Sequence, residues 1–336
     1  MRTSGLKKVA VLMGGWSGER EVSLVSGEGA LKGLCEKGYD VFPIDVTRDM
    51  NKLLKDLSFG PDVIFMGALH GRWVEDGCLQ GLLEILGIPY THSGPAASAI
   101  AMDKALSRNF FERAGLPIAR GALVSQEDFR KKKLPLEYPC VLKPIAEGSS
   151  LGVHILESDK DLEDIEDIWA FGPEALLEQY IPGHEIQVAV LGGKALGAIE
   201  ICPYEGFYDY KAKYTNGCAQ HLMPAPLEKE VYQEVLSLAE KAHDCLQCEG
   251  VSRVDFRYND TLKGPQGFFL LEVNTQPGLT PLSLVPEIAQ HAGMSYNDLL
   301  EWMVENPRCH EKVNSQNPDP DHQQAKVVGK NTQKVG

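Results

Sequence analysis

The first 92 residues alternate apolar runs, glycine turns and amphipathic stretches, and this alternation is the strongest constraint on the fold. KKVAVLMGG predicts a strand that ends in a glycine turn, and the stretch from Trp16 to Gly38 has the pattern of a helix. YDVFPIDV and PDVIFMGAL predict two more strands, and CLQGLLEILG predicts a second helix. Strands that alternate with helices build a parallel α/β sheet. We therefore expect an N-terminal parallel-sheet domain over residues 1–92.

The segment from residue 93 to residue 186 has a different pattern. MDKALSRNFFERAGLP predicts a helix that ends at Gly115 and Pro117. PCVLKP, VHIL and ALLEQYI then predict short strands, and the Gly/Ser loop AEGSSLG separates the first two. We expect this segment to form a second, smaller α+β domain.

The segment 187–306 predicts a third domain. EIQVAVLGGKALGAIEI has the pattern of a hairpin around Gly192 and Gly193, and a helix follows near residues 228–248. SRVDFRYND and QGFFLLEVN predict two antiparallel strands, and SYNDLLEWMVEN predicts a final helix. The apolar periodicity disappears from Pro307 onward, so we expect residues 307–336 to be a disordered tail.

The composition excludes several functional classes. The 336 residues carry a formal net charge of −14, whereas nucleic-acid binding needs clustered Lys and Arg. No apolar run approaches the ~20 residues of a membrane-spanning helix. The N-terminal apolar run is too short for a signal peptide and continues directly into a strand-and-turn pattern. We therefore expect a cytoplasmic protein that binds neither nucleic acid nor membrane.

The two late strands carry polar side chains within apolar runs. Strand side chains alternate between faces, so Glu272 and Asn274 share one face, about 7 Å apart along the strand. By the same rule Arg253 and Asp255 share a face, and pairing of the two strands brings Asp255 near Glu272. Two carboxylates and a carboxamide are hard oxygen ligands that suit Mg²⁺ together with substrate phosphates. The alternative for these side chains is a set of surface ion pairs.

The loop from Glu147 to Gly152, EGSSLG, is a candidate anion site. It follows a predicted strand, and its small residues allow backbone N–H groups to form an anion-binding nest. Lys143 lies just before it and can neutralise a phosphate. The sequence has no G-x-x-x-x-G-K-[ST] motif, and GEGALKG falls inside a predicted helix and lacks the third glycine of a dinucleotide fingerprint.

Eight stretches, in order between residue 9 and about residue 305, resemble the D-alanine–D-alanine ligases of the ATP-grasp superfamily. They are GGWSGEREVS, ALHGRWVEDGCLQGLLE, MDK, VLKPIAEGSSLGV, LLEQYIPGHE, FYDYKAKY, RVDF and LLEVNTQPGLTPLSLVP. Such an ordered series is more specific than any single motif. The resemblance implies a three-domain ATP-grasp fold, of mixed α/β and α+β class, with the parallel sheet as its pre-ATP-grasp domain.

The resemblance also implies how ATP is held. Adenine is expected between the central and C-terminal domains, and the ribose near Glu185. The implied nucleotide-binding residues are Lys104, Lys143, Ser149, Ser150, Glu178, Gln179, Tyr180, Ile181, Glu185 and Lys213. The implied ligands of two Mg²⁺ ions, for which Mn²⁺ is a substitute, are Asp255, Glu272 and Asn274. Gln179 and Tyr180 stand where relatives have a Lys-Trp-like pair, and Trp73 and Val74 stand where many relatives have small residues.

On the substrate side, the resemblance implies two D-alanine sites. Glu19 matches the carboxylate that receives the ammonium group of the first D-alanine, and His70 matches a histidine that orients this substrate. Ser149 and Tyr214 match a hydrogen-bonding triad with Glu19, through which a loop closes over the site. Lys213 in the same loop matches a lysine that contacts the transferred phosphate.

The second D-alanine is expected beside the late strands. Ser283 and the Leu284 backbone match groups that hold its carboxylate. Arg253 and the Gly278 backbone N–H match groups that stabilise the oxyanion of the tetrahedral intermediate. With Glu19, Ser149 and Tyr214, these residues make up the implied catalytic set.

The implied reaction joins two D-alanines through an acyl phosphate, releases ADP and phosphate, and supplies a peptidoglycan precursor. Relatives are usually dimers, so the resemblance leaves open whether this chain forms a homodimer. Two alternatives also stay open. One is an ATP-grasp carboxylate–amine ligase with a different acceptor, and the other is a nucleotide-binding regulator that has lost catalysis. Arg253, Asp255, Glu272 and Asn274 are all present, which argues against the regulator.

Overall fold

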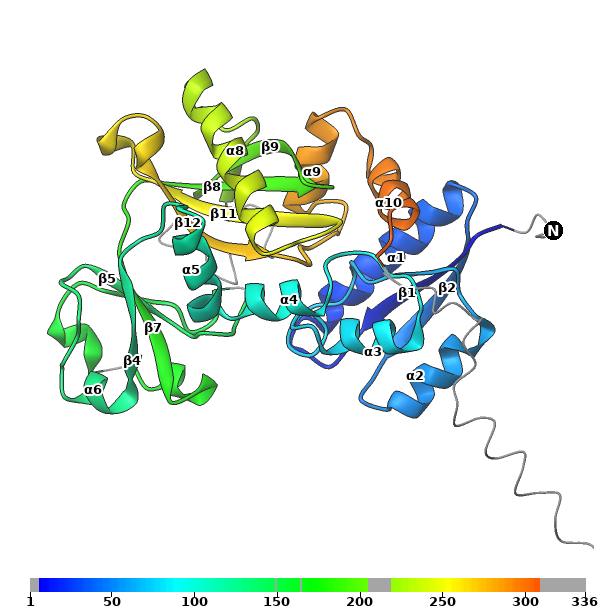
Figure 1. The fold of residues 1–336 in the computed structure, drawn as a ribbon, viewed down its shortest axis with the longest axis horizontal. Helices are drawn as coiled ribbons and strands as arrows, with labels where there is room; N and C mark the ends of the chain where they lie inside the picture. The colour runs from blue at the N-terminus through cyan, green and yellow to red at the C-terminus, as the bar shows by residue number, and fades with distance from the viewer. Residues whose placement is uncertain (1–5, 149, 164, 205–218, 309–336) are drawn as a thin grey trace, which may run out of the picture.

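The computed structural model of the chain describes residues 6–148, 150–163, 165–204 and 219–308. Three sheets organise these residues, with the N-terminal sheet at one end of the molecule and two antiparallel sheets toward the other (Figure 1). In the described ranges, no helix combines the length and the apolar character that a bilayer crossing requires.

The N-terminal sheet is parallel, as the alternating pattern predicts, with strand order β2-β1-β3. Its strands are β1 (Lys8–Gly14), β2 (Asp40–Val46) and β3 (Val63–Phe65), and its helices are α1 (Arg20–Glu36), α2 (Met50–Asp56) and α3 (Cys78–Leu86). β1 is buried from Val9 to Gly14, as expected for the central strand of a parallel sheet, and this burial explains its continuous apolar sequence. The glycines of GEGALKG lie within α1, so they form a helix rather than a phosphate-binding turn.

The central sheet is antiparallel, with strand order β4-β7-β5-β6. Its strands are β4 (Gly121–Ser125), β5 (Cys140–Lys143), β6 (His154–Leu156) and β7 (Glu174–Gln179), and the helices of this part are α4 (Pro95–Met102), α5 (Lys104–Arg113) and α6 (Gln126–Arg130). Asp103 caps α5, because its side chain accepts a hydrogen bond from the N–H of Leu106. This cap fixes the start of α5 at Lys104, a predicted phosphate-binding residue.

The third sheet has five strands in the order β10-β9-β8-β11-β12. They are β8 (His184–Leu191), β9 (Lys194–Pro203), β10 (Ala219–Leu222), β11 (Val251–Tyr258) and β12 (Phe268–Asn274), and the helices are α8 (Lys229–Cys245), α9 (Leu284–His291) and α10 (Tyr296–Glu305). The β8–β9 hairpin turns at Gly192 and Gly193, both with positive φ, as the sequence predicts. β8 begins at His184, so the expected division between residues 186 and 187 falls inside this strand.

One apolar cluster joins the N-terminal sheet to the last two helices. Val11 and Phe65 belong to the same buried cluster as Val285 of α9 and Leu300 of α10. α1 approaches α10 closely at Gly33, where an added Cβ would lie 2.7 Å from Leu300 Cδ1. The loops that follow β1 and β3 are therefore held firmly beside the third sheet.

The structured chain continues through Arg308, beyond the Pro307 boundary expected for the tail. The backbone N–H of Arg308 donates to the Tyr90 carbonyl at 2.7 Å, and the Tyr90 N–H donates back at 2.8 Å. Its guanidinium pairs with Glu84 at 3.2 Å and Glu249 at 2.8 Å. Arg308 thus ties the N-terminal sheet region to the loop before β11, and the remainder of the expected tail lies outside the described residues.

Candidate active site

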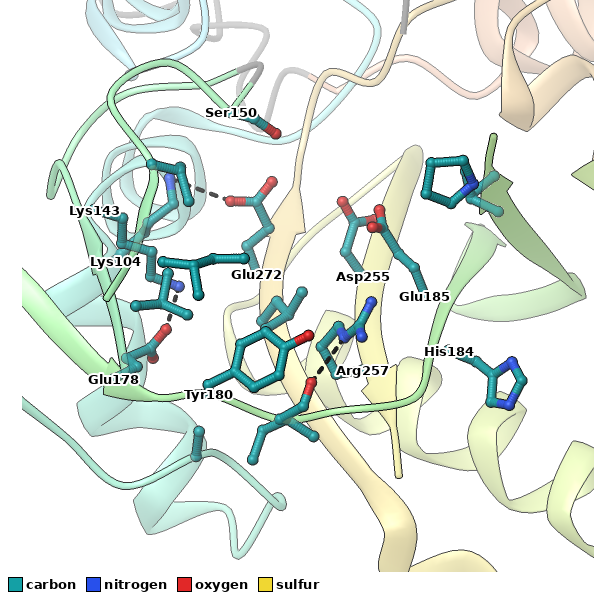
Figure 2. Close-up of a pocket in the computed structure, with 18 of the residues that line it drawn as sticks. Lys104, Lys143, Ser150, Glu178, Tyr180, His184, Glu185, Asp255, Arg257 and Glu272 are labelled. Atoms are coloured by element: carbon teal, nitrogen blue, oxygen red, sulfur yellow. Dashed lines mark hydrogen bonds and ion pairs between the residues drawn. The ribbon is translucent and has the colours of Figure 1, made fainter. Parts of the chain in front are cut away.

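A cavity of about 630 Å³ lies between the central sheet and the third sheet (Figure 2). Its walls come from α5, β5, β7, the loop after β5, and strands β8, β9, β11 and β12. The predicted residues that line it are Lys104, Lys143, Ser150, Glu178, Gln179, Tyr180, Ile181, Glu185, Asp255 and Glu272. The structure therefore gathers nearly the whole predicted nucleotide set and both predicted metal carboxylates around one space. Ser149 and Lys213, the other predicted nucleotide residues, lie outside the described residues, as does Tyr214.

Glu178 is held between two cations on one wall of this cavity. Its carboxylate forms ion pairs with Lys143 of β5 and with Arg108 of α5. All three side chains are buried, and Arg108 also donates to the Ala119 carbonyl at 2.7 Å. A buried carboxylate is stable only when it is paired and hydrogen-bonded, so this clamp fixes Glu178 rigidly. The sequence did not point to Arg108, because its contact with Glu178 is formed between residues distant in the chain.

The segment that crosses from β7 to β8 is pinned by Arg257. This side chain donates to the Ile181 carbonyl at 3.1 Å and to the Gly183 carbonyl at 2.6 Å. Gly183 has φ +97°, and a Cβ there would collide with the Tyr258 carbonyl, so the crossing requires glycine. The predicted adenine-contacting segment therefore has a fixed backbone, with Tyr180 at the cavity wall (Figure 2).

The two late strands pair in the predicted register. Asp255 lies directly opposite Glu272, and Arg253 lies opposite Asn274. Arg253 donates two hydrogen bonds to Asp255, Nε to Oδ1 and Nη2 to Oδ2, each at 2.7 Å. Lys104 Nζ lies 3.2 Å from Glu272 Oε2 (Figure 2). Each predicted metal carboxylate therefore has a cation as its partner in the structure.

The donor set of this face fits Mg²⁺. Asp255 and Glu272 offer carboxylate oxygens into the cavity, and Asn274 lines a small adjoining hollow with Glu272 and Lys104. Mg²⁺ usually takes one or two carboxylates and completes its octahedron with phosphate oxygens and water. Within the described ranges, no three His, Cys, Asp or Glu side chains form a self-sufficient metal cluster. The chemistry of the set therefore suits a metal that arrives with a phosphate ligand.

His70 lies in the turn after β3 and is buried. Its Nδ1 donates to Glu75 Oε1 at 3.3 Å, while its Nε2 is buried and has no partner among the described residues. Burial lowers the pKa of His70, but the hydrogen bond to Glu75 and the charges of Glu75 and Glu19 outweigh burial, so the net pKa is raised. Arg253 also acts on this pKa, so both Glu19 and Arg253 lie within electrostatic reach of His70.

Glu19 immediately precedes α1, in the turn after β1. Its backbone N–H donates to Ser17 Oγ at 3.2 Å, and its carbonyl accepts from the Ser23 N–H at 2.9 Å. Its charge acts on the pKa of His70 and on that of Glu147. Glu19 therefore lies within electrostatic reach of both His70 and Glu147, the first residue of the Gly/Ser loop.

Lys104 and Glu147 connect the substrate side to the nucleotide cavity. Lys104 Nζ donates to the Glu147 carbonyl at 2.6 Å. Burial raises the pKa of the Glu147 carboxyl, and the charges of Lys104 and Arg72 offset this only in part. Neither the Glu147 contact nor the Glu75–His70 contact was predicted from the sequence.

Gly278 and Ser283 lie side by side after β12. An added Cβ at Gly278 would lie 3.2 Å from Ser283 Oγ. Ser283 Oγ accepts from the Thr280 N–H at 3.1 Å and lies 2.7 Å from Thr280 Oγ1. Ser283 directly precedes α9, so Leu284 is the first residue of that helix and its N–H lies at the positive end of the helix dipole.

A residue that the sequence did not single out, Gln276, locks this region together. Its backbone N–H donates to Asn274 Oδ1 at 2.8 Å. Its buried side-chain amide donates to the carbonyls of Met66 at 3.1 Å and Leu69 at 2.7 Å. One buried side chain thus joins the end of β12 to the turn that carries His70.

Known ligases are similar to this chain. The model of the family described as D-ala D-ala ligase C-terminus matches residues 110–305. Over 305 residues the chain is 50% identical to the D-alanine–D-alanine ligase of Granulibacter bethesdensis, covering 90% of this chain and 99% of that protein.

Solved structures match the fold over nearly the whole length. A crystal structure of D-alanine–D-alanine ligase from Bacillus anthracis complexed with ATP superposes with a TM-score of 0.77 at 31% identity, over 90% of this chain and 97% of that one. The VanG D-Ala:D-Ser ligase from Enterococcus faecalis has a TM-score of 0.76 at 28% identity, over 90% and 99% of the two chains. These matches confirm the predicted ATP-grasp fold class.

Proposed function

Because the chain belongs to the D-alanine–D-alanine ligase family, we propose that it joins two D-alanines to D-alanyl-D-alanine with conversion of ATP to ADP and phosphate. One observation carries this proposal: Lys104 and Lys143 line the same cavity as the paired carboxylates Asp255 and Glu272. Glu19 and Arg253 both lie within electrostatic reach of His70, and Glu19 also acts on Glu147, whose carbonyl Lys104 contacts. The product serves cell-wall peptidoglycan synthesis in the cytoplasm.

Asp255, Glu272 and Asn274 would hold Mg²⁺, and the ion would neutralise negative charge on the ATP phosphates. Lys104 and Lys143 add positive charge from the opposite wall. Each lysine is paired with a glutamate in the structure, so the phosphates would compete for ammonium groups that already point into the cavity.

In the first step, a carboxylate oxygen of the first D-alanine forms a bond to the γ-phosphorus, and the bond from that phosphorus to ADP breaks. Glu19 binds the substrate ammonium group, and His70 orients the substrate with a raised pKa that favours the imidazolium form. The lysines stabilise charge on the transferred phosphoryl group. No protein nucleophile is needed, since positioning and charge stabilisation account for the catalysis.

In the second step, the amine of the second D-alanine attacks the acyl carbon, loses a proton, and the acyl–phosphate C–O bond breaks. Arg253 and the Gly278 N–H stabilise the oxyanion of the tetrahedral intermediate. Ser283 and the Leu284 N–H hold the carboxylate of the second substrate at the start of α9, where a helix favours anions. Ser149 and Tyr214 keep their predicted role, with Glu19, in closing a loop that excludes water from the acyl phosphate, and Lys213 keeps its predicted contact with the transferred phosphate.

The test is phosphate release from ATP in the presence of D-alanine, L-alanine, D-lactate, D-serine or no acceptor. We expect release with D-alanine and detection of the dipeptide by mass spectrometry. Release with another acceptor and none with D-alanine would identify a ligase of different specificity, an alternative that the likeness to a D-Ala:D-Ser ligase supports. Failure to release phosphate under every condition would leave the regulatory alternative.

The same preparation tests whether the chain forms the homodimer that the resemblance leaves open. Light scattering on the 36.9 kDa chain should give twice this mass. A mass equal to one chain at micromolar concentration would contradict the dimer and leave the ligase proposal unaffected.

A further inference from the structure

A second cavity, of about 460 Å³, lies in the N-terminal part of the molecule and shares no lining residue with the nucleotide cavity. It opens where β1 and β2 end, between the turn after β1, the start of α2 and the N-terminal half of α3. Ligands of parallel α/β sheets bind characteristically beyond the carboxyl ends of the strands. Both the position and the volume of this cavity are therefore those of a small-molecule site.

The walls of this cavity are apolar and aromatic. Trp16 and Trp73 contribute indole rings, and aliphatic side chains such as Val74 and Leu82 complete the wall. Trp73 has φ +79°, a backbone conformation that a bulky side chain rarely adopts. Strained backbone of this kind concentrates at binding and catalytic sites. Trp73 is 41% exposed despite its size, so the part of its ring that the Arg72 guanidinium does not cover can contact a flat partner.

One arginine of the lining, Arg48, gives the cavity a positive charge, and a second, Arg72, lies over the ring of Trp73. The Arg48 guanidinium lies 5.7 Å from the ring centre of Trp16, and that of Arg72 lies 4.6 Å from the ring centre of Trp73. Arg48, which lines the cavity, has no carboxylate partner in the part of the chain that the structure describes, although the chain carries 47 acidic and 33 basic residues. Arg72 lies outside the lining, and its charge acts on the Glu147 carboxyl. Trp16 Nε1 is also buried and lacks an acceptor among the described residues. A cation without an ion-pair partner and a spare donor beside an apolar cavity favour a ligand that brings an anionic acceptor.

We propose that this cavity binds a small organic anion with a flat apolar body, of the aromatic carboxylate class. The ring lies against Trp16 and Trp73, and the carboxylate pairs with Arg48 at the mouth. This binding does not depend on the proposed ligase function.

The cavity also adjoins the candidate active site. The segment that carries Trp73 and Val74 lies between His70 and Glu75, which form a hydrogen bond on its other side. A ligand that shifts Trp73 would move this pair, so occupancy should raise the KM for D-alanine. This second effect rests on the proposed function, and the binding experiment below separates the two.

The experiment measures protection of a thiol that lines the cavity. Cys78 lines the cavity and is exposed. Cys35, at the end of α1, is also exposed but does not line the cavity, so Cys35 is an internal control. The full chain is alkylated with iodoacetamide in the presence of 2-naphthoate, 2-naphthylmethylamine or neither, and both cysteine peptides are followed by mass spectrometry. We expect 2-naphthoate alone to slow alkylation of Cys78, by several-fold at saturation, with no change at Cys35.

Arg48→Gln supplies the decisive variant, with Arg130→Gln as the matched control on the distant helix α6. Loss of one charged contact should weaken the binding of 2-naphthoate about tenfold in Arg48→Gln. The affinity of Arg130→Gln for 2-naphthoate should equal that of the wild type. Equal protection by the amine, no protection by either probe, or unchanged affinity in Arg48→Gln would overturn the proposal. The proposal would also be overturned if Cys78 resisted alkylation in the absence of a probe, since a second copy of this chain would then cover the cavity. Protection with an unchanged KM for D-alanine would reject only the coupling to the active site.

Discussion

The side-chain amide of Gln276 donates a 2.7 Å hydrogen bond to the carbonyl of Leu69, the residue before His70. The same nitrogen donates to the Met66 carbonyl, and the Gln276 backbone N–H donates to Asn274. Because Asn274 belongs to the proposed metal site and His70 to the proposed substrate site, one residue controls their relative position.

Gln276→Leu should therefore displace His70 without creating a cavity in the core. The substitution keeps the size of the side chain and leaves the Leu69 carbonyl without its donor, while the Met66 carbonyl still accepts from the Leu69 N–H at 3.0 Å. We expect a loss of about 1–3 kcal/mol in the free energy of unfolding. The KM for D-alanine should rise more than the KM for ATP, as steady-state kinetics would reveal. Gln266→Leu, an exposed glutamine with only local hydrogen bonds, is the control. Equal loss of affinity for both substrates would indicate general destabilisation instead.

A different prediction concerns the proposed metal face. Glu272→Gln removes one carboxylate but retains an amide that can lie beside Lys104. The side chain is partly exposed, and the buried side chains of its strand, such as Phe268 and Val273, are unchanged, so the fold should persist. Turnover should fall by about two to three orders of magnitude, the typical loss when a charge-stabilising group is removed. Phosphate release measured across a Mg²⁺ titration checks the loss of turnover, and circular dichroism of the same sample checks that the fold persists. Near-normal turnover with unchanged Mg²⁺ dependence would reject a role for Glu272 in metal binding.

The pKa of His70 offers a test that does not require turnover. Its net pKa is raised because Glu75 and Glu19 outweigh burial. Glu75→Gln removes the main raising contribution, so the pKa of His70 should fall and the imidazole should become neutral at lower pH. NMR titration of the histidine rings would follow this shift. His92 is an internal reference, since burial lowers its pKa to about 3 and it should not titrate between pH 5 and 8.

The stability consequence has a definite sign. A group whose folded pKa is raised stabilises the folded state at pH values below its unfolded pKa, near 6.5, and this contribution disappears as pH rises through the folded pKa. Glu75→Gln should therefore destabilise the protein most at about pH 5–6, and the charge-dependent part of the loss should vanish at high pH. A destabilisation that stays constant from pH 5 to 9 would show that charge on His70 is not involved.

Local periodicity and strand alternation allowed much of this architecture to be predicted. The parallel sheet, the β8–β9 hairpin and the facing pair Asp255 and Glu272 follow from patterns within a few residues or from pairing of adjacent strands. The clamp of Arg108 on Glu178 could not be predicted, because it joins residues 70 positions apart through tertiary packing. Helix α9 also went unrecognised, since Pro286 lies in its first turn, where proline is tolerated but resembles a helix break.

The limit of the functional chain can be located by two truncations. Removal of residues 309–336 should leave the melting temperature unchanged, because this segment has no apolar periodicity. Removal of residues 307–336 also deletes Arg308, and with it two backbone hydrogen bonds to Tyr90 and ion pairs with Glu84 and Glu249. Hydrogen bonds of this kind contribute about 1 kcal/mol each and partly exposed ion pairs less, so we expect a loss of about 2–3 kcal/mol.

Arg308→Leu in the full chain separates the side chain from the backbone contacts. The variant keeps the pairing with Tyr90 and loses only the ion pairs, so its destabilisation should be smaller than that of the shorter truncation. It should also shrink at high salt, because dissolved ions screen the wild-type pairs. Urea unfolding at two salt concentrations measures both effects. If the chain that ends at Asn306 is as stable as the one that ends at Arg308, the contacts of Arg308 do not hold the N-terminal sheet region against the loop before β11.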